Sequence, residues 1–415
     1  MKTLAVLSSE RTQLEQFKLT TIWSAVQKLG LPAAIWKLPH TQKITVLISL
    51  KNDLSTVEAD LVKLPAGFMI APFSWDNQEP VPFIEGDIQI DFSLSGISQG
   101  ITFRNEADKN PVALQLGTTA ATESLKPERS PAILPFHLID QNQNSEKAKF
   151  MNSVKAAVEA IGQHTFQKVV LSRAKKFKVE KSFEIINAYQ KLIGQYAHAF
   201  VSLVNLPERQ EMWLGASPEL LVCTTSGADF STMSLAGTQP AFDQGGMLIP
   251  KNEIRWGQKE IEEHALVSRY IVECFKKIRL REYQETGPKT QQAGNLYHLQ
   301  TDFHVDMKAV HFDELGSVML KLLHPTSAVC GTPKEVSKSF IDKHEDYERS
   351  FYSGFLGPIQ IEGASHLFVN LRTLRLKDDE ATFFAGAGIT EDSNASKEWE
   401  ETEMKCDTLL KVIGG

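Results

Sequence analysis

Strand-like and helix-like segments follow one another irregularly along the second half of the chain, and this order constrains the fold more than any single motif. Strand-like runs lie at 165–179, 198–204 and 211–224. A long helical segment at 254–280 separates them from late strands at 366–376 and 381–388. Strands that cluster without a regular strand–helix–strand repeat favour an α+β layered domain over a parallel α/β fold.

The composition is that of a globular protein whose main partner is not nucleic acid. The chain has 415 residues, of which 42% are hydrophobic and 23% are charged, and this balance argues against disorder. The length suffices for one large domain or two ordinary ones. The net charge of −7 argues against nucleic acid, because binding to phosphates favours a basic surface.

Neither a membrane segment nor an export signal is expected. The apolar run near the N-terminus has only four residues, too few for the core of a signal peptide. No stretch approaches the roughly 18 apolar residues of a transmembrane helix. The four cysteines are scattered without a C-x-x-C pair, which predicts neither a zinc site nor a disulfide framework. We therefore expect a cytoplasmic protein. Residues 117–135 are polar and contain prolines, so we expect a connector there.

Two acidic stretches place pairs of glutamates on one face of a predicted helix. Glu398 and Glu401 are three residues apart in EWEET, and Glu260 and Glu263 have the same spacing in KEIEE. Side chains at this spacing lie about 5–6 Å apart, so like charges repel unless a cation lies between them. Either each stretch is a solvated helix face, or the two helices together hold a divalent cation such as Mg²⁺, which prefers oxygen ligands.

Two ionisable side chains stand among apolar residues. Lys168 lies in QKVVLSR, a strand-like run with apolar residues on both faces. It is either an edge residue that points to solvent or a partly buried amine, and burial lowers the pKa of a lysine toward that of a general base. Glu219 follows a tight bend and precedes LLV. It is either a turn carboxylate or a general acid whose pKa is raised by apolar surroundings.

Several later residues are suited to binding an anion. Gly386 and Gly388 end a strand-like run, and glycine lets backbone N–H groups approach an anion closely. Arg372 offers a guanidinium that can clamp a carboxylate, unless it forms a surface ion pair. Tyr352 and His298 are candidate polar contacts, although a lone histidine is more often structural. With the acid, the base and the acidic pairs, these residues predict a small anionic substrate and proton transfer.

Ordered motifs over residues 145–415 resemble those of the chorismate-utilising enzymes, which include isochorismate, salicylate, anthranilate and aminodeoxychorismate synthases. The matching segments are QKVVLSR, GASPELL, LAGTQP, KEIEEHALV, NLYHLQT, HPTSAVCGTPK, ERSFYSGFLGP, NLRTL and AGAGIT with the following EWEET. The resemblance implies a single large domain of layered, mostly antiparallel β-sheets with flanking helices. Residues 1–140 carry no such match, and the resemblance implies that they form a divergent part packed on the same domain.

Within the family, the chain is most similar to the isochorismate synthases. Lys168 stands where those enzymes place the base that activates water, whereas the ammonia-using members usually carry glutamine. LAGT at 235–238 lacks the lysine of the Pro-Ile-Lys-Gly-Thr motif, which disfavours aminodeoxychorismate synthase, and Ala328 lies in an isochorismate-type segment. One departure is Ile261, which replaces the usual arginine of Lys-Asp-Arg and so removes the contacts of that side chain around the site.

The resemblance implies a magnesium ion that binds the ring carboxylate of chorismate. Its expected ligands are Glu263, Glu398 and Glu401, directly or through water, with Glu260 nearby. Glu403, from the same acidic stretch, is expected to face solvent. No glutamine amidotransferase subunit is expected, and a monomer is the default expectation.

The resemblance also implies roles in chemistry. Lys168 deprotonates water, which attacks ring carbon 2, and Glu219 protonates the hydroxyl that leaves carbon 4, with His298 assisting. The side-chain carboxylate of chorismate is expected to bind to Arg372, Tyr352 and the backbone at Gly386 and Gly388.

Two alternatives to an isochorismate synthase stay open. A salicylate synthase shares this pattern, including the lysine, but also eliminates pyruvate. A non-catalytic chorismate-binding relative would need neither the base nor the acid. Menaquinone and siderophore synthesis both begin with isochorismate, and the sequence does not separate them.

Overall fold

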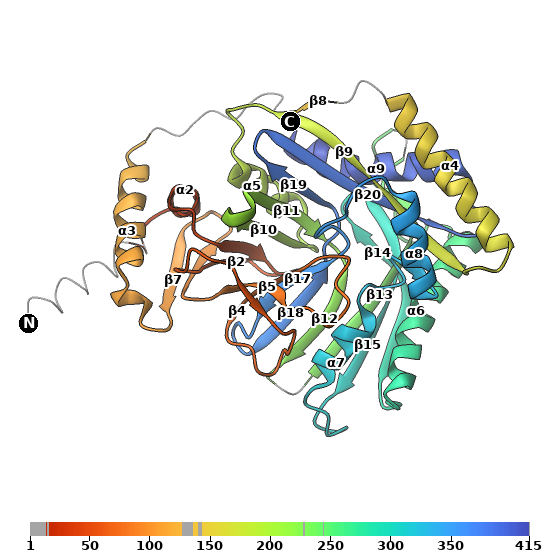
Figure 1. The fold of residues 1–415 in the computed structure, drawn as a ribbon, viewed down its shortest axis with the longest axis horizontal. Helices are drawn as coiled ribbons and strands as arrows, with labels where there is room; N and C mark the ends of the chain where they lie inside the picture. The colour runs from red at the N-terminus through yellow and green to blue at the C-terminus, as the bar shows by residue number, and fades with distance from the viewer. Residues whose placement is uncertain are drawn as a thin grey trace, which may run out of the picture.

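Two large antiparallel β-sheets, with helices on their outer faces, form the molecule (Figure 1). The computed structural model describes residue 14 and residues 16–126, 136–139, 143–226, 229–243 and 245–414. The predicted α+β fold of layered, mostly antiparallel sheets is confirmed, since every strand pairing between the described residues is antiparallel.

The first sheet has 11 strands among the described residues. Along its main path it consists of β16 (Gly331–Thr332), β9 (Lys168–Val179), β20 (Glu380–Ile389), β19 (Thr373–Lys377), β11 (Glu211–Ser217), β10 (Phe200–Leu206), β1 (Ala33–Lys37), β2 (Lys43–Ile48), β6 (Ile88–Ser93) and β7 (Ser98–Phe103), with β8 (Phe136–Leu138) paired to β9.

The second sheet has nine strands in the same part of the chain. In spatial order these are β14 (Gln284–Ala293), β15 (Leu296–Asp306), β13 (Asp229–Pro240), β12 (Leu220–Thr225), β18 (Ala364–Val369), β17 (Phe355–Ile359), β4 (Gly67–Ala71), β5 (Val81–Glu85) and β3 (Ser55–Val57).

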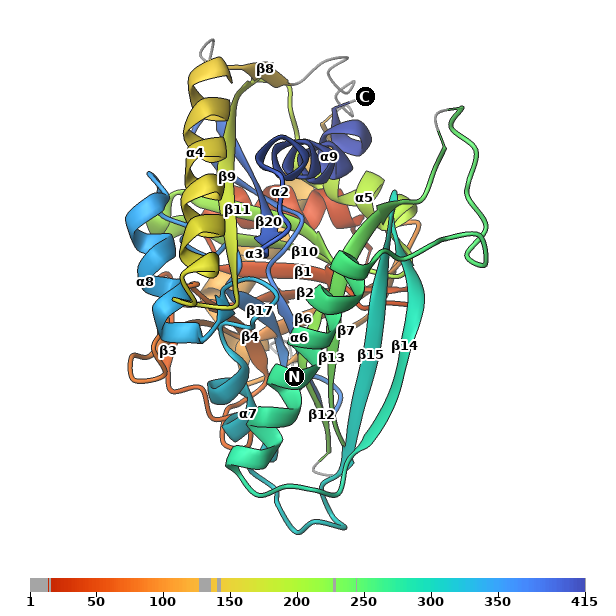
Figure 2. The ribbon, with the colours of Figure 1, turned by 90° about the vertical axis from the view of Figure 1, so that its right-hand side faces the viewer.

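Helices cover the outer faces of both sheets. On the first sheet lie α2 (Leu19–Leu29), α3 (Pro111–Ser124), α5 (Ile185–Gln195) and α9 (Ala395–Ile413). On the second sheet lie α6 (Gln258–Lys277) and α7 (Leu315–Leu323), and α6 runs beside β13 and β15 (Figure 2). Near β9 lie α4 (Gln143–Gly162) and α8 (Lys334–His344), and two 3₁₀ turns span Ala107–Lys109 and Pro207–Arg209.

The N-terminal strands extend both sheets. β1 pairs with β10 in the first sheet, and β4 pairs with β17 in the second. Segments from the two halves of the chain therefore lie side by side and share the apolar core between the sheets.

The expected connector at 117–135 is wrong for its first part, because α3 continues to Ser124. Asn110 caps this helix, with its side-chain oxygen accepting a hydrogen bond from the Val112 N–H at 2.9 Å. Leu116 and Ala120 are buried against the first sheet. Small and polar residues hide this short apolar face in the sequence, and residues 127–135 lie outside the described part.

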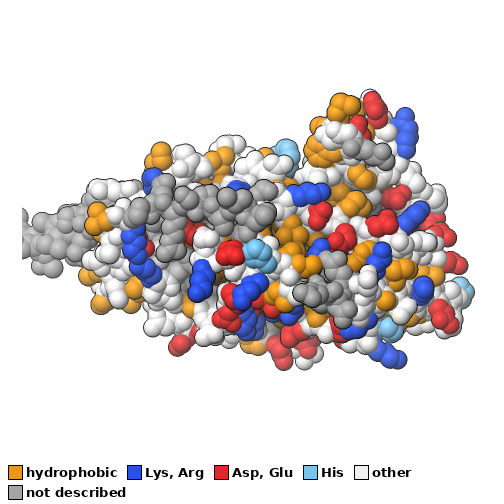
Figure 3. All heavy atoms as spheres, turned by 90° about the horizontal axis from the view of Figure 1, so that it is seen from above, with side chains coloured by type: hydrophobic (Ala, Val, Ile, Leu, Met, Phe, Trp, Pro, Cys, Tyr) orange, Lys and Arg blue, Asp and Glu red, His pale blue; other side chains and the backbone are white. Residues whose placement is uncertain are grey.

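The surface mixes charges of both signs. On the face seen from above, basic and acidic side chains are interspersed (Figure 3). Among the described residues, no helix is both long enough and apolar enough to cross a membrane.

An aromatic pair joins the two sheets and provides a test of the layered core. Phe200 of β10 stacks on Phe368 of β18, with ring centroids 4.2 Å apart, and both rings are buried. We expect Phe200→Ala to lower the free energy of unfolding by about 3–5 kcal/mol, because it leaves a cavity between the sheets. Urea unfolding measures this change. Leu125→Ala, at an exposed position, serves as the control and should change stability by less than about 0.5 kcal/mol.

Candidate active site

A cavity of about 710 Å³ brings together most of the predicted site residues. Its walls come from both sheets and from α6 and α9. The predicted residues that line it are Glu219, Glu263, His298, Ala328, Tyr352, Arg372, Gly386 and Gly388.

Lys168 is a buried amine next to this cavity. Its side chain is 0% exposed, and its Nζ lies 3.1 Å from Glu263 Oε1 without the alignment of a hydrogen bond. Of the two alternatives for Lys168, the structure therefore has the buried amine. Burial alone would raise the pKa of Glu263, but Lys168 and Lys405 lower it below its ordinary value.

A glycine at position 388 makes room for this pair. Lys168 lies on β9, and Gly388 lies beside it on β20. A Cβ atom on Gly388 would collide with Glu263 Oε1 and lie 3.1 Å from Lys168 Cε. The close approach of the ion pair to the strand therefore requires glycine here.

Glu219 has the environment of a general acid. It follows Pro218 between β11 and β12, and its side chain is almost fully buried. Burial raises the pKa of Glu219 to about 7, although the charge of Lys168 and a weak hydrogen bond from Thr326 Oγ1 at 3.4 Å both act to lower it. Near neutral pH this carboxyl is therefore able to hold a proton and to donate it.

Arg372 is buried and is held by His298. Arg372 Nη2 donates to His298 Nε2 at 2.8 Å, and His298 Nδ1 donates to the Gly237 carbonyl at 2.8 Å. These two contacts define the tautomer of the ring, since an arginine can only donate. Burial and the charge of Arg372 hold the pKa of His298 well below its ordinary value. His298 is thus a neutral support for the guanidinium, and Arg372 is not a surface ion pair.

Tyr352 places a hydroxyl beside the other glycine of β20. A Cβ atom on Gly386 would lie 3.1 Å from the Tyr352 hydroxyl. The Tyr352 ring stacks on Phe384, with centroids 5.1 Å apart. Burial raises the pKa of Tyr352 to about 12, so its hydroxyl keeps its proton and can donate a hydrogen bond into the cavity.

The glutamates of α9 are paired with lysines. Glu398 is 1% exposed, and its Oε1 accepts a hydrogen bond from Lys259 Nζ at 2.5 Å. Glu401 Oε1 accepts one from Lys405 Nζ at 2.7 Å. With Lys168 and Glu263, three lysines thus neutralise three acids, one to one. Burial raises the pKa of Glu398, and Lys259 opposes this shift.

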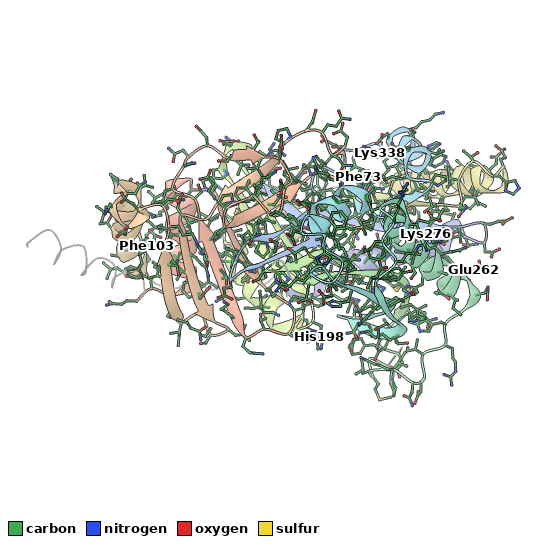
Figure 4. All side chains as sticks on the ribbon, turned by 90° about the horizontal axis from the view of Figure 1, so that it is seen from below. Phe73, Phe103, His198, Glu262, Lys276 and Lys338 are labelled. Atoms are coloured by element: carbon green, nitrogen blue, oxygen red, sulfur yellow. The ribbon has the colours of Figure 1, made fainter. Side chains whose placement is uncertain are left out.

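Two acidic residues play other parts than expected. Glu260 Oε2 accepts a hydrogen bond from the Gly257 N–H at 2.9 Å and caps its own helix. Glu403 does not face solvent, because it pairs with Arg173 and with Lys175, the latter at 2.9 Å. Glu262, by contrast, is exposed on α6 near the edge of the molecule (Figure 4).

Lys405 is a cavity residue that the sequence patterns do not assign to the substrate site. Its Nζ donates to the Gly386 carbonyl at 2.8 Å as well as to Glu401. The spacing of four residues from Glu401 predicts this ion pair, but it carries no sign that the ammonium also faces the cavity. Together with Arg372 it gives the cavity two cationic groups.

The acids are suitable ligands for Mg²⁺, but their side chains are not gathered around one point. Within the described parts of the chain, no three His, Cys, Asp or Glu side chains are close enough together to hold one metal ion. Glu398 Oε2 is nevertheless buried without a hydrogen-bond partner there. Such an oxygen, with Glu263 and Glu401 nearby, suits a hard cation.

Comparison with known proteins identifies the family but not one reaction. Isochorismate synthase EntC of Escherichia coli K12 is 28% identical over 282 residues, which cover 67% of this chain and 70% of that protein. Anthranilate synthase component 1 of Aquifex aeolicus is 29% identical over 65% of this chain and 54% of its own length.

Solved structures share the fold. The menaquinone-specific isochorismate synthase MenF of Escherichia coli superposes with a TM-score of 0.72 at 20% identity, over 94% of this chain and 91% of that one. The family model described as "Chorismate binding enzyme" matches residues 97–414. The chain therefore belongs to the chorismate-binding enzyme family.

Proposed function

We propose that the protein is an Mg²⁺-dependent isochorismate synthase, which converts chorismate to isochorismate. The observation that carries the proposal is a cavity lined by Glu219, whose pKa is raised to about 7, with the buried amine of Lys168 next to it, 3.1 Å from the lining residue Glu263. Family membership and relatives named isochorismate synthase, such as EntC, support the choice of substrate and reaction.

In this proposal the two ends of the substrate are held by different groups. Arg372, fixed by His298, and the Tyr352 hydroxyl bind the side-chain carboxylate. Glu263, Glu398 and Glu401 hold Mg²⁺, which when bound neutralises the ring carboxylate. Glu260 is left out of the ligand set because it caps α6.

Proton transfer then needs one base and one acid. Lys168 takes a proton from a water molecule while the oxygen of that water bonds to ring carbon 2. The bond from carbon 4 to its hydroxyl breaks, and Glu219 supplies the proton that turns this hydroxyl into water. One water is consumed and one is released, so the product is an isomer of the substrate. Each proton transfer contributes on the order of 10²–10⁴-fold in rate.

We also propose that the enzyme works alone. A lysine at position 168 activates water rather than ammonia, so a glutamine amidotransferase subunit has no role in the reaction. We also propose a monomer in the cytoplasm, as expected from the sequence. EntC and MenF are both named isochorismate synthases, and MenF is described as menaquinone-specific. We propose that the isochorismate made by this protein enters menaquinone or siderophore synthesis.

Product analysis tests the reaction directly. We expect chorismate and Mg²⁺ to give a product of unchanged mass, and EDTA to abolish it, because in the proposal Mg²⁺ neutralises the ring carboxylate of the substrate. Chromatography with mass detection separates the outcomes. Salicylate with pyruvate would identify a salicylate synthase, and unchanged chorismate would indicate a binding relative.

Replacing the base tests the role of Lys168. We expect Lys168→Ala to lower kcat by at least about 10²-fold while the fold is retained, because the variant lacks the proposed base. Lys176→Ala, at an exposed position on the same strand, is the matched control and should keep full activity. A Lys168→Ala enzyme with turnover close to that of the wild type would contradict the assignment.

The pH profile tests the role of Glu219. The carboxyl must be protonated to act, so kcat/KM should fall tenfold per unit above about pH 7. Glu219→Gln should lose on the order of 10²–10⁴-fold in kcat and retain no such alkaline limb. A wild-type profile that is flat from about pH 6 to about pH 9 would rule out a proton donor with this pKa.

The stability of the same variant gives a test that is independent of turnover. The folded-state pKa of about 7 exceeds the ordinary value of 4.5, so the folded protein binds more protons between these values. The stabilisation from Glu219 is therefore fully present below about pH 4.5 and is lost as the pH rises through 7, a change of about 3 kcal/mol. Urea unfolding near pH 5 and pH 8 should show that Glu219→Gln lacks this loss. Equal pH dependence in both proteins would contradict the raised pKa.

A further inference from the structure

Lys259 occupies the carboxylate that the proposed ion would need. Its Nζ lies 2.5 Å from Glu398 Oε1, while Oε2 of the same buried carboxylate has no hydrogen-bond partner among the described residues. A lysine from α6 thus neutralises a buried carboxylate of α9, the helix that also carries Glu401.

Of the three lysines that neutralise these acids, Lys259 is held least firmly. Lys168 is fully buried beside Glu263. Lys405 donates to two acceptors, one of which is a backbone carbonyl. Lys259 makes one hydrogen bond within the described structure, and its side chain is 28% exposed. It can therefore turn into solvent without burying a charge, whereas Glu398 is 1% exposed.

We propose that Lys259 is an internal competitor of the divalent ion: its ammonium neutralises Glu398 in the ion-free enzyme and leaves for solvent when the ion binds. This inference rests on the proposed Mg²⁺-dependent function. Two cations at one carboxylate repel each other, so the ion and the ammonium exclude each other. Lys259 thereby keeps a buried acid neutralised when the ion is absent, at the cost of weaker ion binding.

Direct ion binding tests the proposal without reference to turnover. Mn²⁺, which shares the preference of Mg²⁺ for oxygen ligands, is titrated into each protein while free Mn²⁺ is followed by electron paramagnetic resonance. We expect Lys259→Met to lower the Kd for Mn²⁺ at least about tenfold, because a competing unit charge in contact with Glu398 is removed. Lys259→Arg keeps the charge and should bind within about threefold of the wild type.

Two further variants make the result specific. Lys397→Met removes the same charge from an exposed position beside Glu398, and a change of less than about threefold is expected there. Lys259→Gln keeps a hydrogen-bond donor for Glu398 and should bind Mn²⁺ tightly even if the methionine variant fails to fold. Far-UV circular dichroism and the Tm establish folding.

The outcomes separate this inference from the function on which it rests. Equal Mn²⁺ affinity in the wild type, Lys259→Met and Lys259→Gln would overturn the competitor role and leave the metal site intact. Weaker Mn²⁺ binding by folded Lys259→Met and Lys259→Gln than by the wild type would also overturn the competitor role. Failure of every protein, the wild type included, to bind Mn²⁺ would overturn the metal-dependent function itself.

Discussion

The need to neutralise buried acids governs the arrangement of the cavity. Glu398 is buried and Glu263 is 17% exposed, and a carboxylate without a partner in such a place is destabilising. The chain meets this need with lysines from β9 and α6. The cationic groups that an anionic substrate requires are Arg372 and Lys405, which line the cavity. Lys405 also pairs with Glu401, so charge pairing and the preparation of the site overlap in this residue.

The two sheets bring these groups together from distant parts of the chain. Lys168 lies on the strand next to β20, and Glu219 lies where the chain passes from the first sheet to the second. Glu263 and Glu398 come from helices that cover different sheets. A cavity at the junction of both sheets can therefore hold an acid and a base in different surroundings, and this difference allows one group to be a proton donor while the other is a proton acceptor.

Motifs in the sequence were sufficient to predict the layered fold, and most of the predicted site residues line the cavity, because they lie in or next to strongly patterned segments. Partners across the cavity could not be predicted. The pair of Lys259 and Glu398 joins residues 139 positions apart, and no local pattern indicates it. Local patterns also misled in places. Small residues concealed α3, and Glu403 looked solvated because its partners, Arg173 and Lys175, lie on a distant strand.

The continuity of the sheets across both halves of the chain has a consequence for how the sequence can vary. β10 and β17 would become open edges if β1 and β4 were removed, and long unpaired edges with apolar faces invite pairing between molecules. The N-terminal segment, whose strands β1 and β4 are themselves buried, must therefore keep strands that shield those two edges. Protection against pairing between molecules, in addition to its share of the core, ties this segment to the rest of the protein.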